Sequence, residues 1–267
     1  MVRSFFENGR KPYETGNERG LINLAFPLHR FEEFGTLTSA EHQAITTLGD
    51  APQAFKRHAR IRGEDVLPTC FYLLVEGWVA AAQILPDGRR QILKIHLPGD
   101  ALGTPSMCMA RTAEELTALT DVVVVPVSLK RFGALFDTHP RIAARFLLSV
   151  QYERIALMDQ LASMGRTSSE ARLAAFLIDL FERLEPLGAV QGDSFDLKVT
   201  QEQMGDLLGL TSVHVNRMIR GLEKQGLISR SSHRITFLNR QGLQQLAVRP
   251  VRQRIVDRSW LPKARSD

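Results

Sequence analysis

The chain has 267 residues, of which 44% are hydrophobic and 24% are charged, a composition typical of a globular protein long enough for two domains. Its two cysteines are too few for a disulfide framework or for an iron–sulfur cluster with four cysteine ligands. No apolar run approaches the roughly 18 residues that a membrane span needs. Residues 1–20 also have no apolar core of signal-peptide length, so we expect a cytoplasmic protein without a membrane segment.

The net charge of +5 is unevenly distributed along the chain. Residues 1–165 contain 18 basic and 18 acidic residues, whereas residues 166–267 contain 16 Lys and Arg against 11 Asp and Glu. A basic C-terminal part behind a neutral body predicts a domain that binds a polyanion such as nucleic acid, attached to a domain with another role.

A polar and basic extension over residues 1–20 precedes a segment typical of β-structure. From about residue 52 to residue 128, short apolar runs alternate with turn residues. Two of these runs are joined by the PDG tripeptide at residues 86–88, which is a hairpin signal. Short strands with regular turns predict an antiparallel sandwich or small barrel, and we assign residues 21–138 to this β-domain.

From residue 139 the pattern becomes helical. Apolar residues recur at alternating spacings of four and three over about three heptads, which is typical of a coiled-coil seam. The alternative is a helix that packs on its own domain, but the helix predicted over residues 139–165 is longer than a small β-domain can cover. We therefore predict that the helix pairs with a second copy of the chain through Leu147, Val150, Arg154, Leu157, Leu161 and Met164.

Gly165 interrupts the long helix, and we place a domain boundary there. A Ser/Thr cap signal in the TSSE sequence then opens another helix. Residues 185–199 are rich in turn residues and are expected to form a connector. We assign residues 166–247 to a C-terminal domain and residues 248–267 to a basic tail.

Residues 201–228 have the spacing of a helix-turn-helix. Thr200 and Gln203 form a capping-box pattern at the start of the first helix. Gly205, at the fifth position, leaves room for a second helix to cross closely. Gly209, at the ninth, can take the left-handed conformation that a tight interhelical turn requires.

The second helix has the composition of a DNA-recognition helix. Val215 and Met218 lie where it must face the first helix, and the remaining positions are rich in hydrogen-bonding groups. Arginine can bond guanine bidentately, asparagine can pair with adenine, and valine can contact the methyl group of thymine. Residues 226–239 then predict two short strands around a polar turn, a wing whose Arg230, His233 and Arg234 would lie near phosphate.

The resulting set of DNA-binding residues is Thr211, Ser212, Val213, His214, Asn216, Arg217 and Arg220, with Arg234 from the wing. For His214, a phosphate contact and a purely flanking position are both open. Thr211 is in addition placed to cap the second helix.

The segments GWVAAAQILPDGRRQI, LPGDALG and TQEQMGDLLGLTSVHVNRMIRGLEKQGLI, with the long helix, resemble the cyclic-AMP receptor and fumarate–nitrate reduction regulator (Crp/Fnr) superfamily of bacterial transcription factors. The resemblance covers roughly residues 30–247. It implies an α+β fold with an N-terminal antiparallel β jelly-roll of the cyclic-nucleotide-binding type, a dimerisation helix and a C-terminal winged helix-turn-helix. It also implies a homodimer on a palindromic operator, with double-stranded DNA as partner and RNA polymerase as a further one.

The cyclic-nucleotide cassette of that superfamily is incomplete in this sequence. Nucleotide-binding members have a glutamate for the ribose and an arginine for the cyclic phosphate after a turn like that in PGDALG. Here Thr104, or Pro105 if the register shifts by one residue, stands at the glutamate position, and Glu114 and Glu115 follow the arginine-like step at Arg111. We therefore expect that cyclic AMP is not a strong activator. The candidate pocket residues are Gly99, Asp100, Gly103, Thr104, Arg111 and Thr112.

Two alternatives for the control of this protein remain open. One is a cyclic nucleotide. The other is control by the level of the protein or by a partner, with no small-molecule effector. The oxygen-sensing members use an N-terminal cysteine cluster, which is absent here because the first cysteine is Cys70. The recognition helix also departs from many relatives, which have a glutamate where this chain has Val213.

Other function classes find little support. A metal-dependent cupin would need a His-x-His pair with further ligands, and His96 has no histidine two residues away. We expect no enzymatic activity, catalytic residue, metal site or cofactor. A non-specific architectural DNA-binding protein is the second class, but Asn216 and Arg217 at base-contacting positions favour sequence-specific regulation.

Overall fold

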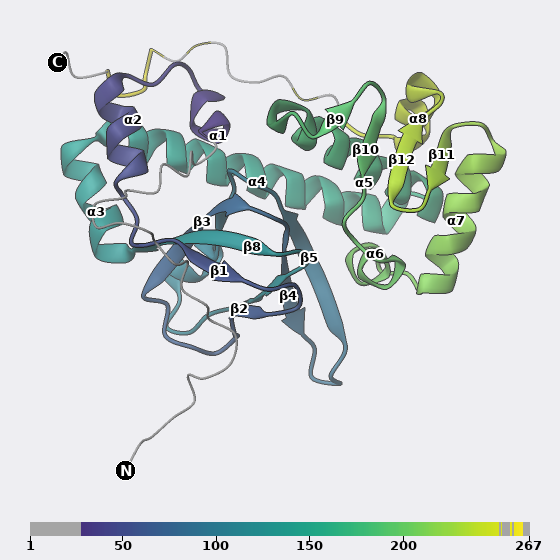
Figure 1. The fold of residues 1–267 in the computed structure, drawn as a ribbon, viewed down its shortest axis with the longest axis horizontal. Coiled ribbons are helices and arrows are strands. Elements are labelled where there is room, and N and C mark those ends of the chain that lie inside the picture. The colour runs from purple at the N-terminus through teal and green to yellow at the C-terminus, as the bar shows by residue number, and fades with distance from the viewer. Residues whose placement is uncertain (1–27, 251, 253–256, 258, 264–267) are drawn as a thin grey trace, which may run out of the picture. The chain divides into compact units, whose positions relative to one another are not determined.

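The computed structural model describes residues 28–250, 252, 257 and 259–263 (Figure 1). The predicted extension over residues 1–20 and parts of the basic tail lie outside these ranges. The chain forms two compact units, one built mainly from the residues up to Leu147 and the other mainly from Leu148–Trp260, here called the β-roll unit and the winged-helix unit. In the described ranges, no helix is both long and apolar enough to cross a membrane.

The β-roll unit contains two sheets. One has the strand order β1 (Gln53–Phe55), β8 (Val122–Ser128), β3 (Cys70–Glu76) and β6 (Ala101–Leu102). The other has the order β2 (Arg60–Arg62), β7 (Glu115–Ala118), β4 (Val79–Ile84) and β5 (Arg90–His96). The predicted hairpin connects β4 to β5, where Gly88 takes the positive φ of 82° that its turn requires.

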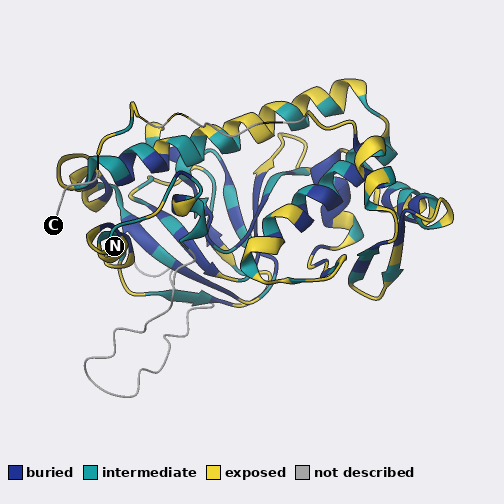
Figure 2. Cartoon of the chain, turned by 90° about the horizontal axis from the view of Figure 1, so that it is seen from above, coloured by how far each residue is buried: buried dark blue, intermediate teal, exposed yellow. Residues whose placement is uncertain are grey.

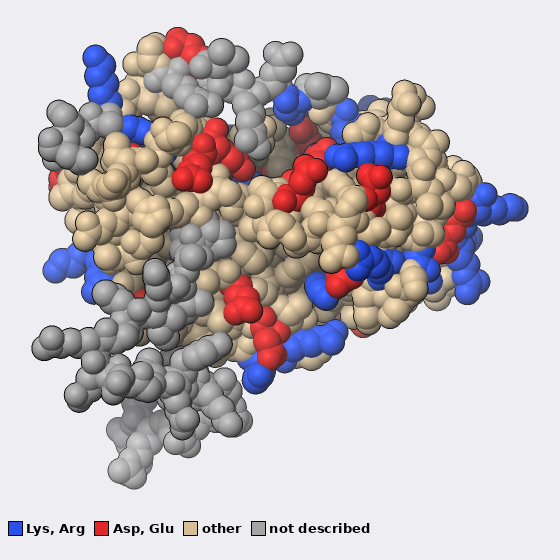
Figure 3. Space-filling view, turned by 45° about the horizontal axis from the view of Figure 1, so that its top comes forward, with Lys and Arg blue, Asp and Glu red and all other residues tan. Residues whose placement is uncertain are grey.

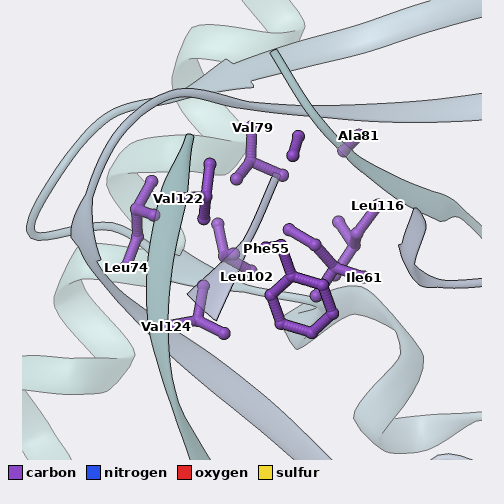
Figure 4. Close-up of a cluster of buried hydrophobic side chains, with 10 residues drawn as sticks. Phe55, Ile61, Leu74, Val79, Ala81, Leu102, Leu116, Val122 and Val124 are labelled. Atoms are coloured by element: carbon purple, nitrogen blue, oxygen red, sulfur yellow. The ribbon is translucent and has the colours of Figure 1, made fainter. Parts of the chain in front are cut away.

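Alternate residues of these strands form the core between the two sheets (Figure 4). Side chains one residue apart on a strand point to opposite faces of a sheet, so alternate residues of each sheet face this core. Burying one Val, Leu or Phe side chain of this kind contributes about 1.5–3 kcal/mol. The core residues are Phe55, Leu74, Leu102, Val122 and Val124 from the first sheet and Ile61, Val79, Ala81, Leu116 and Ala118 from the second.

Helices also belong to this unit: α1 (His29–Glu32), α2 (Ser39–Thr46), the 3-10 helix η1 (Thr104–Cys108), α3 (Leu129–Thr138) and the start of α4 (Pro140–Arg166). The rings of Phe132 in α3 and Phe146 in α4 pack with Phe71 of β3, with centroid separations between 4.6 and 5.4 Å. The long helix predicted over residues 139–165 is present as α4.

Arg145 joins the first turns of α4 to the loop after α1. This residue is only 2% exposed. Its Nη1 donates to the carbonyl oxygens of Phe31 and Gly35 at 3.2 and 2.9 Å, and its Nη2 donates to that of Thr36 at 2.7 Å. These three hydrogen bonds hold the start of α4 against the loop after α1.

The winged-helix unit has the helices α5 (Ser169–Leu184), α6 (Gln201–Leu208), α7 (Ser212–Lys224) and α8 (Arg240–Ala247), with the 3-10 helix η2 (Glu185–Leu187). Its sheet has the order β11 (Ile228–Ser231), β12 (Arg234–Phe237), β10 (Ser194–Asp196) and β9 (Val190–Gln191). Phe181 of α5 packs against Phe195 and Phe237 of the sheet, with ring centroids 6.0 and 5.0 Å away.

The expected α+β fold with a jelly-roll-like domain and a winged helix-turn-helix is confirmed. The expectation of a connector over residues 185–199 is wrong, because β9 and β10 lie there and extend the wing sheet, with Phe195 opposite Ile235. The predicted wing is formed by β11 and β12, with Ser232 at a φ of 54° in the turn. The predicted boundary at Gly165 lies at the end of α4, whereas the compact units part inside this helix.

Candidate nucleic-acid interface and effector site

The helix-turn-helix is built by local capping interactions. The Thr200 hydroxyl accepts from the Gln203 backbone N–H at 3.1 Å, and the Gln203 side chain accepts from the Thr200 N–H at 2.9 Å. Gly209 ends α6 in the left-handed region, with φ 67° and ψ 41°. At Gly205 the reason for glycine differs from the expectation: a Cβ would lie 2.5 Å from the carbonyl oxygen of Leu210, so the close neighbour is the turn.

Helix α7 has one buried face and one exposed face. Thr211 caps it by accepting from the His214 N–H at 3.2 Å. The opposite face includes Val213, which is 79% exposed although it is apolar. Buried residues of α7 are Val215, Ile219 and Leu222, while Ser212, Val213, Arg217 and Arg220 are exposed.

Two of the predicted contact residues are held by neighbouring side chains. The Asn216 side-chain N–H donates to Oε1 of Gln201, the first residue of α6, at 3.0 Å. Nη2 of Arg217 lies 3.4 Å from Nε2 of His214. Since a guanidinium only donates, the His214 ring must accept in this contact, and the histidine thus lies beside Arg217 on α7.

The wing supplies further basic groups. Nη2 of Arg234 donates to Oε1 of Gln191 in β9 at 2.6 Å, so this arginine is steadied against the sheet. The backbone N–H of Arg230 donates to the Glu223 carboxylate at 3.1 Å, and His233 is exposed in the turn. Figure 3 shows Lys and Arg side chains projecting from the right-hand edge of the molecule.

In the β-roll unit, the first group of pocket candidates is the turn of PGDALG. Gly99 has a φ of 94°, and a Cβ there would lie 2.3 Å from the His29 ring. The buried Asp100 carboxylate accepts from the Leu97 N–H at 3.1 Å and pairs with Arg30 at 2.9 Å. Lys94 and His96 lie 3.7 and 3.4 Å from the same carboxylate. Asp100 is therefore a structural anchor of the turn.

A buried ion pair that the sequence did not reveal lies beside Gly103. The side chains of Arg62 and Glu114 are only 6% and 5% exposed, and their charged atoms are 2.5 Å apart. Ser106 joins them, accepting from Arg62 at 3.2 Å and donating to Glu114 at 2.8 Å. A Cβ on Gly103 would lie 2.3 Å from Nη1 of Arg62, so the guanidinium fills the space next to this glycine. We call Arg62, Ser106 and Glu114 the inner cluster.

The other pocket candidates, Arg111, Thr112 and Thr104, are not among the residues of the inner cluster. Arg111 is exposed, and its Nη1 donates to the carbonyl oxygen of Asp65 at 2.9 Å. Thr112 is buried, and its hydroxyl donates to the carbonyl oxygen of Gly63 at 2.8 Å. Thr104 opens η1 and is half-buried. The presumed phosphate arginine thus serves a surface loop contact.

Helix α4 is largely exposed over its C-terminal part (Figure 2), and its exposed apolar residues there, Ile155, Leu157, Met158, Leu161 and Met164, are called the apolar stripe. Leu161 is 73% exposed, and Met158, which the heptad pattern had not included, is also exposed. Of the predicted interface residues, Leu147, Arg154, Leu157, Leu161 and Met164 are exposed and Val150 is half-buried.

Two family models match the chain. Residues 52–139 match the cyclic nucleotide-binding domain, and residues 171–246 match the Crp-like helix-turn-helix domain. The nitrogen fixation regulation protein FixK of Azorhizobium caulinodans is 30% identical over 226 residues, which cover 82% of this chain and 90% of that protein. The chain belongs to the Crp/Fnr superfamily.

Other relatives of this Crp/Fnr protein agree. The transcriptional activatory protein AadR of Rhodopseudomonas palustris is 31% identical and covers 73% of the chain and 80% of its own length. The structure of FixK2 from Bradyrhizobium japonicum is 26% identical with a TM-score of 0.67, covering 75% of this chain and 98% of that one. The Thermus thermophilus regulator TTHB099, at 23% identity, a TM-score of 0.59 and coverages of 73% and 95%, shows the same fold.

Membership of the superfamily gives the general function. The Crp/Fnr protein is a sequence-specific DNA-binding transcription regulator that acts as a homodimer on a palindromic operator. It is not an enzyme, since its relatives are transcription regulators. The match to the cyclic nucleotide-binding domain concerns the fold of the β-roll unit, and the effector has to be argued from the residues of this chain.

Proposed function

We propose that the regulator recognises its operator through the exposed face of α7 in the major groove, with the wing on the phosphate backbone. The observation that supports this most is the composition of that face: a nearly fully exposed Val213 lies among Ser212, Arg217 and Arg220 while the opposite face is buried. An apolar side chain and two guanidinium groups in the first turns of a recognition helix match the contacts available on base edges.

An Arg217→Ala variant tests this proposal. If Arg217 bonds guanine, its loss should cost about 1–3 kcal/mol on the operator and relax the preference at one base pair. An Arg234→Ala variant, which loses a phosphate contact, should weaken binding to all duplexes alike and lower the salt slope by about 1. Both variants are titrated against the operator and a scrambled duplex at several salt concentrations.

Lys224→Ala is a matched control, since Lys224 is an exposed cation at the far end of α7. It should leave the ratio between operator and scrambled duplex unchanged. Equal losses of Arg217→Ala on the two duplexes would mean that Arg217 contacts phosphate, and the proposed base recognition would then lack its main residue.

We further propose that the β-roll unit does not use a cyclic nucleotide. A cyclic phosphate requires a cation that is free to bind it, but the buried cation Arg62 is already neutralised by Glu114, and Arg111 lies at Asp65 on the surface. The carboxylate of Glu114 would also repel a phosphate placed beside the inner cluster. Without a cyclic nucleotide, control by the level of the protein or by a partner is the alternative that the sequence analysis leaves.

RNA polymerase is the partner that we propose for the DNA-bound dimer. The proposal is supported by two relatives that carry the names transcriptional activatory protein and transcriptional activator protein, since a contact with the polymerase is one way to activate transcription. The proposed place of action is the bacterial cytoplasm, where the chromosome lies.

A further inference from the structure

A side chain outside the recognition helix touches one of the proposed base-contacting residues. Asn216 is half-buried on α7, next to Arg217, and its amide nitrogen donates to Oε1 of Gln201 at 3.0 Å. Gln201 is the first residue of α6, directly after the cap Thr200. The capping box fixes the backbone of this first turn, so the Gln201 side chain projects from a rigid position toward Asn216.

The contact with Gln201 limits which hydrogen-bonding groups of the Asn216 amide can meet a base. The amide has two N–H groups on nitrogen and one acceptor oxygen. One N–H is used by Gln201, and one N–H and the oxygen remain. Adenine presents an acceptor at N7 and a donor at N6 in the major groove, which match this remaining pair.

The other bases fit the remaining pair less well, since cytosine offers its N4 donor without an acceptor beside it. Guanine presents two acceptors, N7 and O6, and thymine presents an acceptor and a methyl group. An asparagine whose oxygen faces the base would meet another acceptor on either of them. If the amide rotated by half a turn, the Asn216 oxygen would instead face the acceptor oxygen of Gln201 in its present orientation.

We infer that Gln201 is a positioning residue that orients the Asn216 amide for adenine, so that each half-site of the operator contains an adenine contacted by Asn216. This inference rests on the proposed recognition of bases by α7. It adds a residue of the first helix of the motif to the determinants of sequence preference.

Two substitutions test whether the residue at position 201 must offer a hydrogen-bond acceptor to Asn216. Gln201→Glu keeps only acceptors and should preserve the Asn216 orientation, whereas Gln201→Lys offers only donors and should turn the Asn216 oxygen inward. Each variant is titrated against operator duplexes with adenine, guanine or 7-deazaadenine at the position where Asn216→Ala removes the base preference. The added charge changes the affinity for all duplexes alike, so the ratio between duplexes reports only the preference.

For the wild type and Gln201→Glu, we expect adenine to be preferred over guanine by about 5- to 150-fold. In Gln201→Lys and in Asn216→Ala, this preference should fall to within about threefold. Replacing adenine by 7-deazaadenine, which lacks the N7 acceptor, should weaken the wild type but not Asn216→Ala. The matched controls Gln225→Glu and Gln225→Lys, at an exposed glutamine at the end of α7, should keep the full preference.

Retention of the adenine preference in Gln201→Lys, or its loss in Gln201→Glu, would overturn the positioning role and leave base recognition by α7 intact. If Gln201→Lys does not fold, the result of Gln201→Glu still decides. If Asn216→Ala keeps every base preference, Asn216 does not contact a base, and the inference is wrong. Failure of the broader proposal is recognised separately, by equal losses of Arg217→Ala on operator and scrambled duplex.

Discussion

A Leu161→Asp variant is expected to be monomeric and to bind the operator about 10²–10⁴-fold more weakly than the wild type, because linked half-site contacts gain affinity of that order over a single one. Leu161 is 73% exposed in the single chain and lies in the apolar stripe of α4. In a dimer that pairs through this stripe, the new carboxylate would be buried without a partner, at a cost of several kcal/mol. Sedimentation velocity measures the oligomeric state.

Ala156→Asp is the control for this prediction. Ala156 is also exposed on α4 but lies off the predicted seam, so this variant should remain dimeric and bind normally. Since Leu161 is exposed in the single chain, its replacement should leave each protomer folded. A Leu161→Asp protein that still sediments as a dimer with normal operator affinity would show that the copies pair elsewhere.

A Glu114→Ala variant is expected to lower the free energy of unfolding of the β-roll unit by about 3–5 kcal/mol, because it leaves the buried guanidinium of Arg62 without its carboxylate. The loss is a large fraction of the roughly 5–15 kcal/mol that stabilises a typical domain. Trp78 is buried in this unit, so its fluorescence during urea unfolding reports the transition.

The neighbouring Glu115 supplies the matched control. It lies 3.6 Å from the largely exposed Arg60, and such a pair contributes at most about 1 kcal/mol. Replacing both members of the inner pair, in Arg62→Met with Glu114→Leu, should cost less than the two single changes together, since no charge is then left buried. Similar losses for Glu114→Ala and Glu115→Ala would contradict the assignment of a buried ion pair.

The parts of the site that the sequence predicted are those decided by local chemistry. The Thr200–Gln203 capping box, the left-handed Gly209 and the Thr211 cap each depend on residues within a few positions of one another. The long helix followed from heptad spacing in the same way. These features need no knowledge of the tertiary fold, since backbone propensity and side-chain capping define them.

The inner cluster was missed because it depends on strand order. Arg62 and Glu114 are 52 residues apart, and they meet only because β2 pairs with β7, with Arg62 opposite Leu116. The strands β9 and β10 were missed for a related reason. They are two and three residues long, too short for a periodic pattern. Strand β10 pairs with β12 far along the chain, and β9 pairs with β10.

The contact of Gln201 with Asn216 was also missed because it depends on the tertiary fold, although these residues are closer in sequence. The role of Gln201 depends on the crossing of α6 and α7, which brings it to Asn216, 15 residues away. The sequence correctly predicted both helices and the polar face of α7. It gave no signal that Asn216 is held by a residue of the first helix, because a glutamine after a cap is common in helices that bind nothing.

Selection of duplexes from a random pool by the wild-type protein, with and without millimolar cyclic AMP, tests the central claim most directly. We expect the same inverted repeat under both conditions, with half-site centres about one helical turn, ~34 Å, apart. Recovery of no consensus sequence or of a single asymmetric site would contradict recognition by a symmetric dimer. Enrichment that requires cyclic AMP would contradict the account of the β-roll unit.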